Sequence, residues 1–305
     1  MLSGPDAAPP PPAPTWGELQ AGVEVLLRRA GIVAAEAEAR TLASHVAGAA
    51  PGQLPLIRGE SATPEQTERL RGLAAHRAAG EPLQYVTGEA YFLGLRLRCG
   101  PGALIPRPET EELAAHVVEL ARRCPVVASL VADVGTGSGA LALGLAHHLP
   151  EAGVVATDLS AEALALARQN AAAHQLQDRV RFLQGPYLQP LLQAGLAAEL
   201  TAVVCNPPYV SAVEWDALPP GVRDHEPREA LLGLDEDGAG FYRRLIPEIA
   251  AHAPGVRLVA FEVGHRQAAT VAALLREALL HLRVEVRRDL AGIERIVTGE
   301  APEDG

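Results

Sequence analysis

The second half of the chain alternates short apolar runs with helical patterns, and this alternation constrains the fold more than any other feature. The runs are rich in β-branched residues and occupy residues 130–134, 154–157, 180–183, 202–205 and 258–263. Strands that alternate with helices form a parallel sheet with helices on both faces. Two later runs, residues 284–287 and 293–297, predict a closing antiparallel hairpin. We therefore predict an α/β fold with a doubly wound sheet.

The beginning of the chain differs in composition. Residues 1–14 hold six prolines among alanines, a composition that favours extended polyproline II and packs no core, so we predict a disordered tail. Residues 15–80 predict a small helical domain. Thr15 and Thr63 each stand three residues before Glu or Gln, the pattern of a capping box, and Gly80 suits the end of the last helix.

The spacing of apolar residues changes in the middle of the chain. From residue 85 to residue 105 apolar and polar side chains alternate, which is typical of strands. We predict a β-hairpin linker over residues 81–107. Residues 108–300 then form the α/β domain, and residues 301–305 form a short tail.

Charge and cysteine content limit the possible partners. Acidic residues outnumber basic ones 37 to 26, giving a formal charge of −11, so the chain is a poor partner for nucleic-acid phosphates or anionic membranes. Cys99, Cys124 and Cys205 are odd in number and far apart, which argues against a disulfide framework or a structural zinc site. Neither a long apolar run nor a signal-peptide pattern occurs. We predict a cytoplasmic protein with no membrane partner.

Three glycines follow the first predicted strand. Gly135, Gly137 and Gly139 allow sharp turns and a close approach to a ligand. Asp158 follows the next strand, where a carboxylate can accept hydrogen bonds from both hydroxyls of a ribose. The G-x-G-x-G spacing favours a nucleoside without a pyrophosphate over a dinucleotide. A tight structural turn remains the alternative for the loop, and bonds to turn amides remain the alternative for Asp133.

A second loop, Asn206, Pro207, Pro208 and Tyr209, follows the predicted strand at 202–205. The prolines keep Asn206 extended and remove a backbone donor, leaving the Asn206 side-chain oxygen and the Pro207 carbonyl as rigid acceptors beside an aromatic ring. In a doubly wound sheet, ligands bind where the strand order reverses, so we expect both loops to face one crevice. Such acceptors suit a planar NH2, because an amide nitrogen is a weak nucleophile that must be oriented. An ordinary strand-to-loop exit remains the alternative.

These loops, together with residues 80–88, 104–110 and 222–228, resemble the HemK/PrmC family of class I S-adenosylmethionine-dependent methyltransferases. Members of that family methylate the glutamine of the Gly-Gly-Gln tripeptide in peptide-chain release factors. The resemblance implies a seven-stranded, Rossmann-like methyltransferase sheet joined by a β-hairpin to a small helical domain. It also implies S-adenosylmethionine as cofactor, S-adenosylhomocysteine as product and a release factor as partner. We expect a monomer with no metal and no direct nucleic-acid contact.

The resemblance also assigns roles to particular residues. The implied cofactor contacts are Asp133, Gly135, Thr136, Gly137, Ser138, Gly139, Asp158, Tyr187 and Asn206. The implied catalytic residues are Asn206, Pro207 and Tyr209, and the implied substrate contacts are Asn206, Pro207, Pro208, Tyr209, Arg107 and Glu109. Many relatives carry an acidic residue before the aromatic residue that contacts adenine, whereas this chain has Pro186. Glu109 equally suits a helix N-terminus, where a negative charge is favourable.

Other functions stay open on the sequence alone. The sister family methylates a glutamine of a large-subunit ribosomal protein, but usually has R-S-P where this chain has Arg107, Pro108 and Glu109. A nucleic-acid exocyclic-amine methyltransferase shares the second loop, but the acidic charge and the lack of a basic, aromatic-rich extension count against it. The glycine spacing disfavours a nicotinamide-dependent oxidoreductase. A non-catalytic cofactor-binding adapter is the remaining alternative.

Three features outside the loops have simpler interpretations. Residues 235–238 resemble the start of a calcium loop but lack its remaining ligands, so we predict a turn. Cys205 lies inside an apolar strand and is expected to be a small buried hydrophobic residue. Arg223 and Arg228 either face the protein substrate or form a solvated ion-pair surface.

Overall fold

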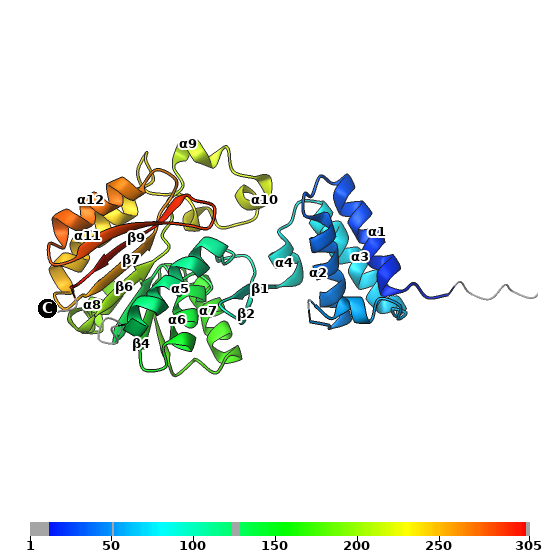
Figure 1. Ribbon diagram of the computed structural model, residues 1–305, viewed down its shortest axis with the longest axis horizontal. Coiled ribbons are helices and arrows are strands. Elements are labelled where there is room, and N and C mark those ends of the chain that lie inside the picture. Colours follow the sequence, from blue (N-terminus) through cyan, green and yellow to red (C-terminus); the bar gives the residue numbers. More distant parts are fainter. Residues whose placement is uncertain (1–11, 51, 124–128, 303–305) are drawn as a thin grey trace, which may run out of the picture. The chain divides into compact units, whose positions relative to one another are not determined.

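The structure is a computed structural model that describes residues 12–50, 52–123 and 129–302. It divides into two compact units, Met1–Thr87 and Gly88–Gly305 (Figure 1). Most of the predicted N-terminal tail, Cys124 and the last three residues of the predicted C-terminal tail lie outside the described residues. In the described part of the chain, no helix combines the length and the apolar character needed to cross a bilayer.

The first unit is helical, as predicted. Its elements are α1 (Trp16–Arg29), α2 (Ala35–Ala47), the short 3-10 helix η1 (Leu54–Leu56), α3 (Pro64–Ala78) and α4 (Leu83–Thr87). Both predicted capping boxes are present, at Thr15 for α1 and at Thr63 for α3. Gly80 has a φ of 106° and donates to the Arg77 carbonyl, which closes α3 as predicted. Three leucines form the centre of the core: Leu27, Leu42 and Leu70.

The predicted alternation fails at its first residues, because Leu83–Thr87 forms the helix α4 instead of a strand. Leu83 and Val86, one helical turn apart, both pack against the core of the first unit, and this packing outweighs the strand-like pattern. The predicted hairpin follows. It pairs β1 (Glu89–Phe92) with β2 (Leu95–Arg98) in antiparallel register.

The second unit contains the predicted seven-stranded sheet. Its strands are β3 (Leu130–Val134), β4 (Gly153–Asp158), β5 (Val180–Gln184), β6 (Ala202–Cys205), β7 (Leu258–Glu262), β8 (Arg283–Arg288) and β9 (Glu294–Glu300). Their order is β5-β4-β3-β6-β7-β9-β8. The strands from β3 to β7 are parallel, and β9 is antiparallel to both of its neighbours, so the predicted closing hairpin is confirmed.

Helices cover both faces of this sheet (Figure 1). The helices described in this unit, not all of which lie on the sheet, are α5 (Pro108–Arg123), α6 (Ala140–His148), α7 (Ala161–Ala173), α8 (Gln189–Gln193), η3 (Ala197–Glu199), α9 (Ala212–Trp215), α10 (Pro220–Arg223), η4 (Arg228–Ala230), α11 (Gly240–His252) and α12 (Ala268–Ala278). One core joins α5, α6 and the β1–β2 hairpin to one face, and a second joins α8, α11 and α12 to the other. The central strands are mostly apolar because both of their faces are covered.

The strand order reverses between β3 and β6. From β3 the chain adds β4 and β5 on one side and then β6 and β7 on the other. The strands β3 and β6 are parallel neighbours, with Asp133 opposite Val204. The Cys205 thiol is buried, as predicted, and donates to the Val134 carbonyl at 2.7 Å. The glycine loop (residues 135–139) follows β3, and the Asn206 loop (residues 206–209) follows β6. Both loops therefore leave the same edge of the sheet from adjacent strands, where ligands bind in doubly wound folds.

Candidate active site

The glycine loop uses its glycines for two different purposes. Gly135, Gly137 and Gly139 have φ values of 78°, 56° and 85°, a region that L-residues with side chains rarely adopt. A Cβ on Gly135 or Gly137 would meet no atom within 4 Å, so both positions border open space that a ligand can fill. A Cβ on Gly139 would lie 3.1 Å from the Ala167 Cβ, so this glycine lets α6 pack closely against α7.

Asp133 braces the glycine loop from inside. Its buried Oδ2 accepts hydrogen bonds from the Thr136 hydroxyl at 2.6 Å and from the Ala142 backbone N–H at 3.0 Å. These bonds tie the end of β3 to the loop and to the first turn of α6. Burial raises the pKa of the Asp133 carboxyl to about 7, against the opposing effect of the two hydrogen bonds.

Asp158 lies at the end of β4, beside the glycine loop. One carboxylate oxygen accepts from the Gly137 N–H at 2.8 Å and the other from the Ser160 N–H at 2.9 Å. Burial raises the pKa of this carboxyl. Each oxygen keeps the capacity to accept a further hydrogen bond, which is what two ribose hydroxyls require. The next side chain, Leu159, is 70% exposed and places an apolar surface beside this carboxylate.

Tyr187 lies close to Asp158 along the sheet edge. The Gly185 N–H donates to the Asp158 carbonyl at 2.9 Å, which draws the segment after β5 toward β4. Tyr187 itself has a φ of 48° and packs its ring against Phe241, with the ring centroids 4.8 Å apart. The ring is only partly buried, so it retains surface that a planar ligand can contact.

The Asn206 carboxamide has a defined orientation. Its Nδ2 donates to the Thr110 hydroxyl at 2.8 Å, from the first turn of α5. Among the described residues, no hydrogen bond reaches the Asn206 Oδ1 or the Pro207 carbonyl oxygen. The two acceptors predicted from the sequence are thus present and available.

A buried carboxylate, that of Glu262, bonds to side chains of the Asn206 loop and of α5. Glu262, at the end of β7, accepts from the Thr110 hydroxyl at 2.6 Å and from the Tyr209 hydroxyl at 2.9 Å. Burial raises the pKa of Glu262, and burial together with the Glu262 charge raises the pKa of Tyr209. Sequence reasoning missed Thr110 and Glu262. A glutamate at the end of an otherwise apolar strand was the available signal.

Gln267 holds the backbone of the same loop. Its buried side-chain amide donates to the Tyr209 carbonyl at 2.9 Å and to the Asp237 carbonyl at 2.8 Å, and accepts from the Gly264 N–H at 2.9 Å. Sequence reasoning did not single out Gln267.

The predicted turn at residues 235–238 is confirmed, and Arg243 forms ion pairs with its two aspartates. No group of metal ligands occurs in the described ranges.

Two segments that carried the family resemblance meet in space. The buried Glu226 carboxylate accepts from the Arg107 guanidinium and from the Ile105 N–H, the latter at 3.0 Å. Glu109 lies in the first turn of α5, and its charge acts on both Glu262 and Tyr209. The position of Glu109 thus suits both a substrate contact and a favourable negative charge at the N-terminus of α5.

The two surface arginines also have partners in the structure. Arg223 forms an exposed ion pair with Asp224, and Arg228 lies over the Trp215 ring at 5.3 Å. The Arg223–Asp224 pair matches the predicted ion-pair surface.

Comparisons with known proteins identify the family of this chain. Residues 18–88 match the PrmC N-terminal domain, and residues 115–218 match the methyltransferase small domain. The release factor glutamine methyltransferase of Deinococcus radiodurans is 44% identical over 272 residues, 89% of this chain and 93% of that protein. The chain belongs to the release factor glutamine methyltransferase family. The Bradyrhizobium diazoefficiens member is 38% identical over 89% of this chain and 90% of its own length.

A solved structure supports the fold of this family member. The catalytic domain of hMettl16, crystallised with a MAT2A 3′UTR hairpin, aligns with a TM-score of 0.54 at 16% identity. The alignment covers 79% of this chain and 84% of that domain. At this identity the likeness concerns the fold alone.

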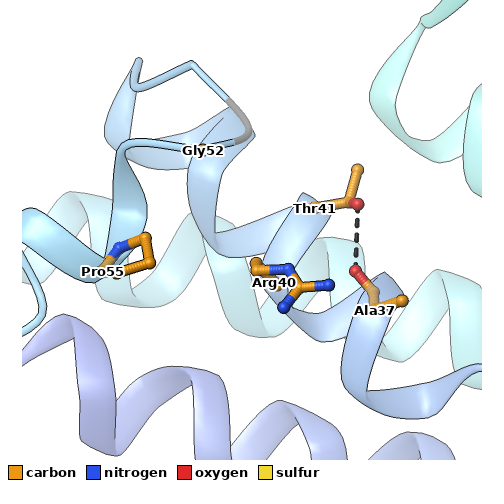
Figure 2. A pocket seen from close by; sticks show the side chains of 5 residues that line it. All are labelled: Ala37, Arg40, Thr41, Gly52 and Pro55. Carbon is orange, nitrogen blue, oxygen red and sulfur yellow. Dashed lines mark hydrogen bonds between the residues drawn. The ribbon is translucent and has the colours of Figure 1, made fainter.

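A pocket on the helical unit is a weaker candidate site (Figure 2). Its lining residues are Ala37, Arg40, Thr41, Gly52 and Pro55. The Thr41 hydroxyl donates to the Ala37 carbonyl of its own helix at 3.0 Å, so it is not directed at a ligand. These lining residues include no carboxylate, thiol or imidazole. The site at the ends of β3 and β6 is therefore the stronger candidate for the active site.

Proposed function

We propose that this chain transfers a methyl group from S-adenosylmethionine to the side-chain amide nitrogen of a glutamine, the glutamine of the Gly-Gly-Gln tripeptide in peptide-chain release factors. The observation that carries the proposal is the pair of available acceptors, Asn206 Oδ1 and the Pro207 carbonyl, beside the glycine loop. The 44% identity to a release factor glutamine methyltransferase supports the same substrate.

The glycine loop and the ends of β4 and β5 fit the cofactor. Open space beside Gly135 and Gly137 accommodates the methionine portion, and Thr136, Ser138 and Gly139 complete the loop. The Asp158 carboxylate accepts from the ribose hydroxyls. When bound, S-adenosylmethionine supplies a methyl group already activated by its sulfonium.

We assign three further residues to the cofactor site. The Tyr187 ring packs against adenine with its remaining surface. Asp133 acts from beneath by holding the loop in shape. The Asn206 segment borders the cofactor as well as the substrate, because β6 lies next to β3.

The second loop binds and orients the substrate amide. Asn206 Oδ1 and the Pro207 carbonyl each accept one N–H of the glutamine, which fixes the plane of the weakly nucleophilic nitrogen. Pro208 and the Tyr209 ring restrict the pocket, with Arg107 and Glu109 near its border. A dedicated strong base is unnecessary, because the nitrogen loses its proton readily once it carries the methyl group.

The family substrate also suggests where and how the enzyme acts. Release factors work on ribosomes, so we place the enzyme in the cytoplasm, where it acts as a monomer and contacts its protein substrate without binding nucleic acid. The net charge of −11 supports the absence of nucleic-acid binding, because a net negative charge repels nucleic-acid phosphates.

The test is transfer of labelled methyl from S-adenosylmethionine to a purified release factor, with the modified residue located by mass spectrometry. A release factor with Gly-Gly-Ala in place of Gly-Gly-Gln is the control. Label on the glutamine amide is expected. Label elsewhere, on a ribosomal-protein glutamine or on an adenine amine offered in parallel, contradicts the assignment.

An enzyme variant tests the role of the acceptor loop. Asn206→Ala is expected to keep cofactor binding measurable by calorimetry but to lower kcat about 100- to 1000-fold, the effect of removing one oriented group from an active site. Unchanged turnover in Asn206→Ala contradicts the role given to this side chain.

A further inference from the structure

Glu262 is a buried carboxyl group that the proposed reaction does not itself use. Its side chain is inaccessible to solvent. Arg295, whose charge acts on it, forms its ion pair with Asp289 instead, with Nε and Oδ2 3.6 Å apart. A carboxylate buried without an ion pair is unfavourable unless hydrogen bonds compensate for the lost hydration. Its presence behind the substrate loop therefore requires an explanation.

The hydrogen bonds around Glu262 have a fixed direction. Both Glu262 oxygens accept a hydrogen bond from a hydroxyl, the pattern of an ionised carboxylate, so the Thr110 hydroxyl uses its single proton on Glu262. That hydroxyl can then only accept from Asn206, which turns the Asn206 Nδ2 toward Thr110. The Asn206 oxygen is the end that remains for the pocket.

The chain of hydrogen bonds from Glu262 through Thr110 to Asn206 is called the relay below. The register of the sheet makes this relay possible. Cys205 and Phe261 are partners across β6 and β7, so Asn206 and Glu262 are the next residues along two adjacent parallel strands. Thr110 lies between the two side chains and bonds to both. Tyr209 donates to the second oxygen of Glu262 at 2.9 Å and thereby occupies the other end of the carboxylate.

We propose that Glu262 is a positioning residue that sets the hydrogen-bond direction of the Asn206 carboxamide through Thr110, so that its oxygen faces the substrate. The proposal rests on the proposed function, because an NH2 substrate requires an acceptor. The oxygen and NH2 ends of a carboxamide have nearly the same shape. Without the relay, the NH2 of Asn206 would face the NH2 of the glutamine in part of the molecules, placing a donor against a donor.

The decisive variant is Glu262→Gln, which preserves shape but adds an NH2 that can donate to Thr110 or Tyr209. We expect kcat to fall about 10- to 100-fold, the usual effect of losing a group that orients a site residue. The Kd for S-adenosylmethionine and the KM for the release factor should change less than about threefold, and the thermal midpoint should not fall. Thr110→Val should lower kcat similarly, and the double variant should fall no further, because both changes break one relay.

Tyr242→Phe is the matched control. The Tyr242 hydroxyl donates to the backbone carbonyl of Glu262 at 2.6 Å and does not contact its carboxylate. Loss of this buried bond should lower the thermal midpoint by about 2–8 °C while kcat is retained. If Glu262 only stabilised the fold, Glu262→Gln would instead behave like Tyr242→Phe, and the proposal would be overturned.

A spectroscopic measurement separates this proposal from the proposed function. The side-chain amide signals of Asn206, identified by their loss in Asn206→Ala, should form one protected pair in the wild type and a broadened or doubled pair in Glu262→Gln. An unchanged signal overturns the relay whatever the substrate is. Absence of glutamine methylation by the wild type refutes the function without affecting this measurement. Wild-type methylation with full kcat in Glu262→Gln refutes only the positioning role.

Discussion

Replacing Asp133 by asparagine should change how the stability of the enzyme depends on pH. The Asp133 carboxyl is buried and has a pKa of about 7, against an ordinary value of 3.8. Below pH 3.8 the folded and unfolded chains both carry the proton. As the pH rises toward 7 the unfolded chain loses it first, so the unfolded state gains stability relative to the folded state.

The size of the effect follows from the two pKa values. At about 1.4 kcal/mol per pKa unit, the difference between 3.8 and about 7 amounts to about 4 kcal/mol of unfolding free energy lost between pH 4 and pH 8. The substituted asparagine cannot ionise, and its side-chain oxygen can still accept from Thr136 and Ala142. Relative to the wild type, Asp133→Asn should therefore gain about 4 kcal/mol over this range.

Urea unfolding at several pH values measures this difference, with hydrogen exchange of the β3 amides reporting on the second unit alone. The pKa values of Asp158 and Glu262 are also raised, but both groups are present in wild type and variant and largely cancel. Glu151→Gln, which replaces an exposed carboxylate, is the control and should follow the wild type. A stability difference between Asp133→Asn and wild type that stays constant with pH would refute the burial argument.

Three further substitutions test the scaffold of the site. Gly139→Ala should lower the unfolding free energy by about 1–3 kcal/mol in urea, because its φ is 85° and the new Cβ would press on Ala167. Arg107→Ala leaves the buried Glu226 carboxylate without its cation, so the thermal midpoint should fall, and Arg107→Lys should restore part of it. Gln267→Leu leaves three backbone groups unpaired, so kcat and the thermal midpoint should fall together, and a fall in neither would contradict its anchoring role.

Local features were readable from the sequence because their causes lie within a few residues. The capping boxes at Thr15 and Thr63 join residues three apart, and the apolar runs became strands close to the predicted bounds. The positive φ values of Gly135 and Gly137 follow from the same local logic. At residues 83–87, by contrast, contacts with the helical core prevailed over the local pattern.

The tertiary structure alone decided which side chains orient the site. Thr110 and Glu262 are 152 residues apart, and Arg107 and Glu226 are 119 residues apart, yet each pair is joined by a hydrogen bond. Such pairings depend on the order and register of strands and on where α5 begins, and no local periodicity encodes them. The sequence by itself determined the two loops and their chemistry. The folded sheet determined that the Asn206 amide and the buried Glu262 carboxylate both form hydrogen bonds with Thr110.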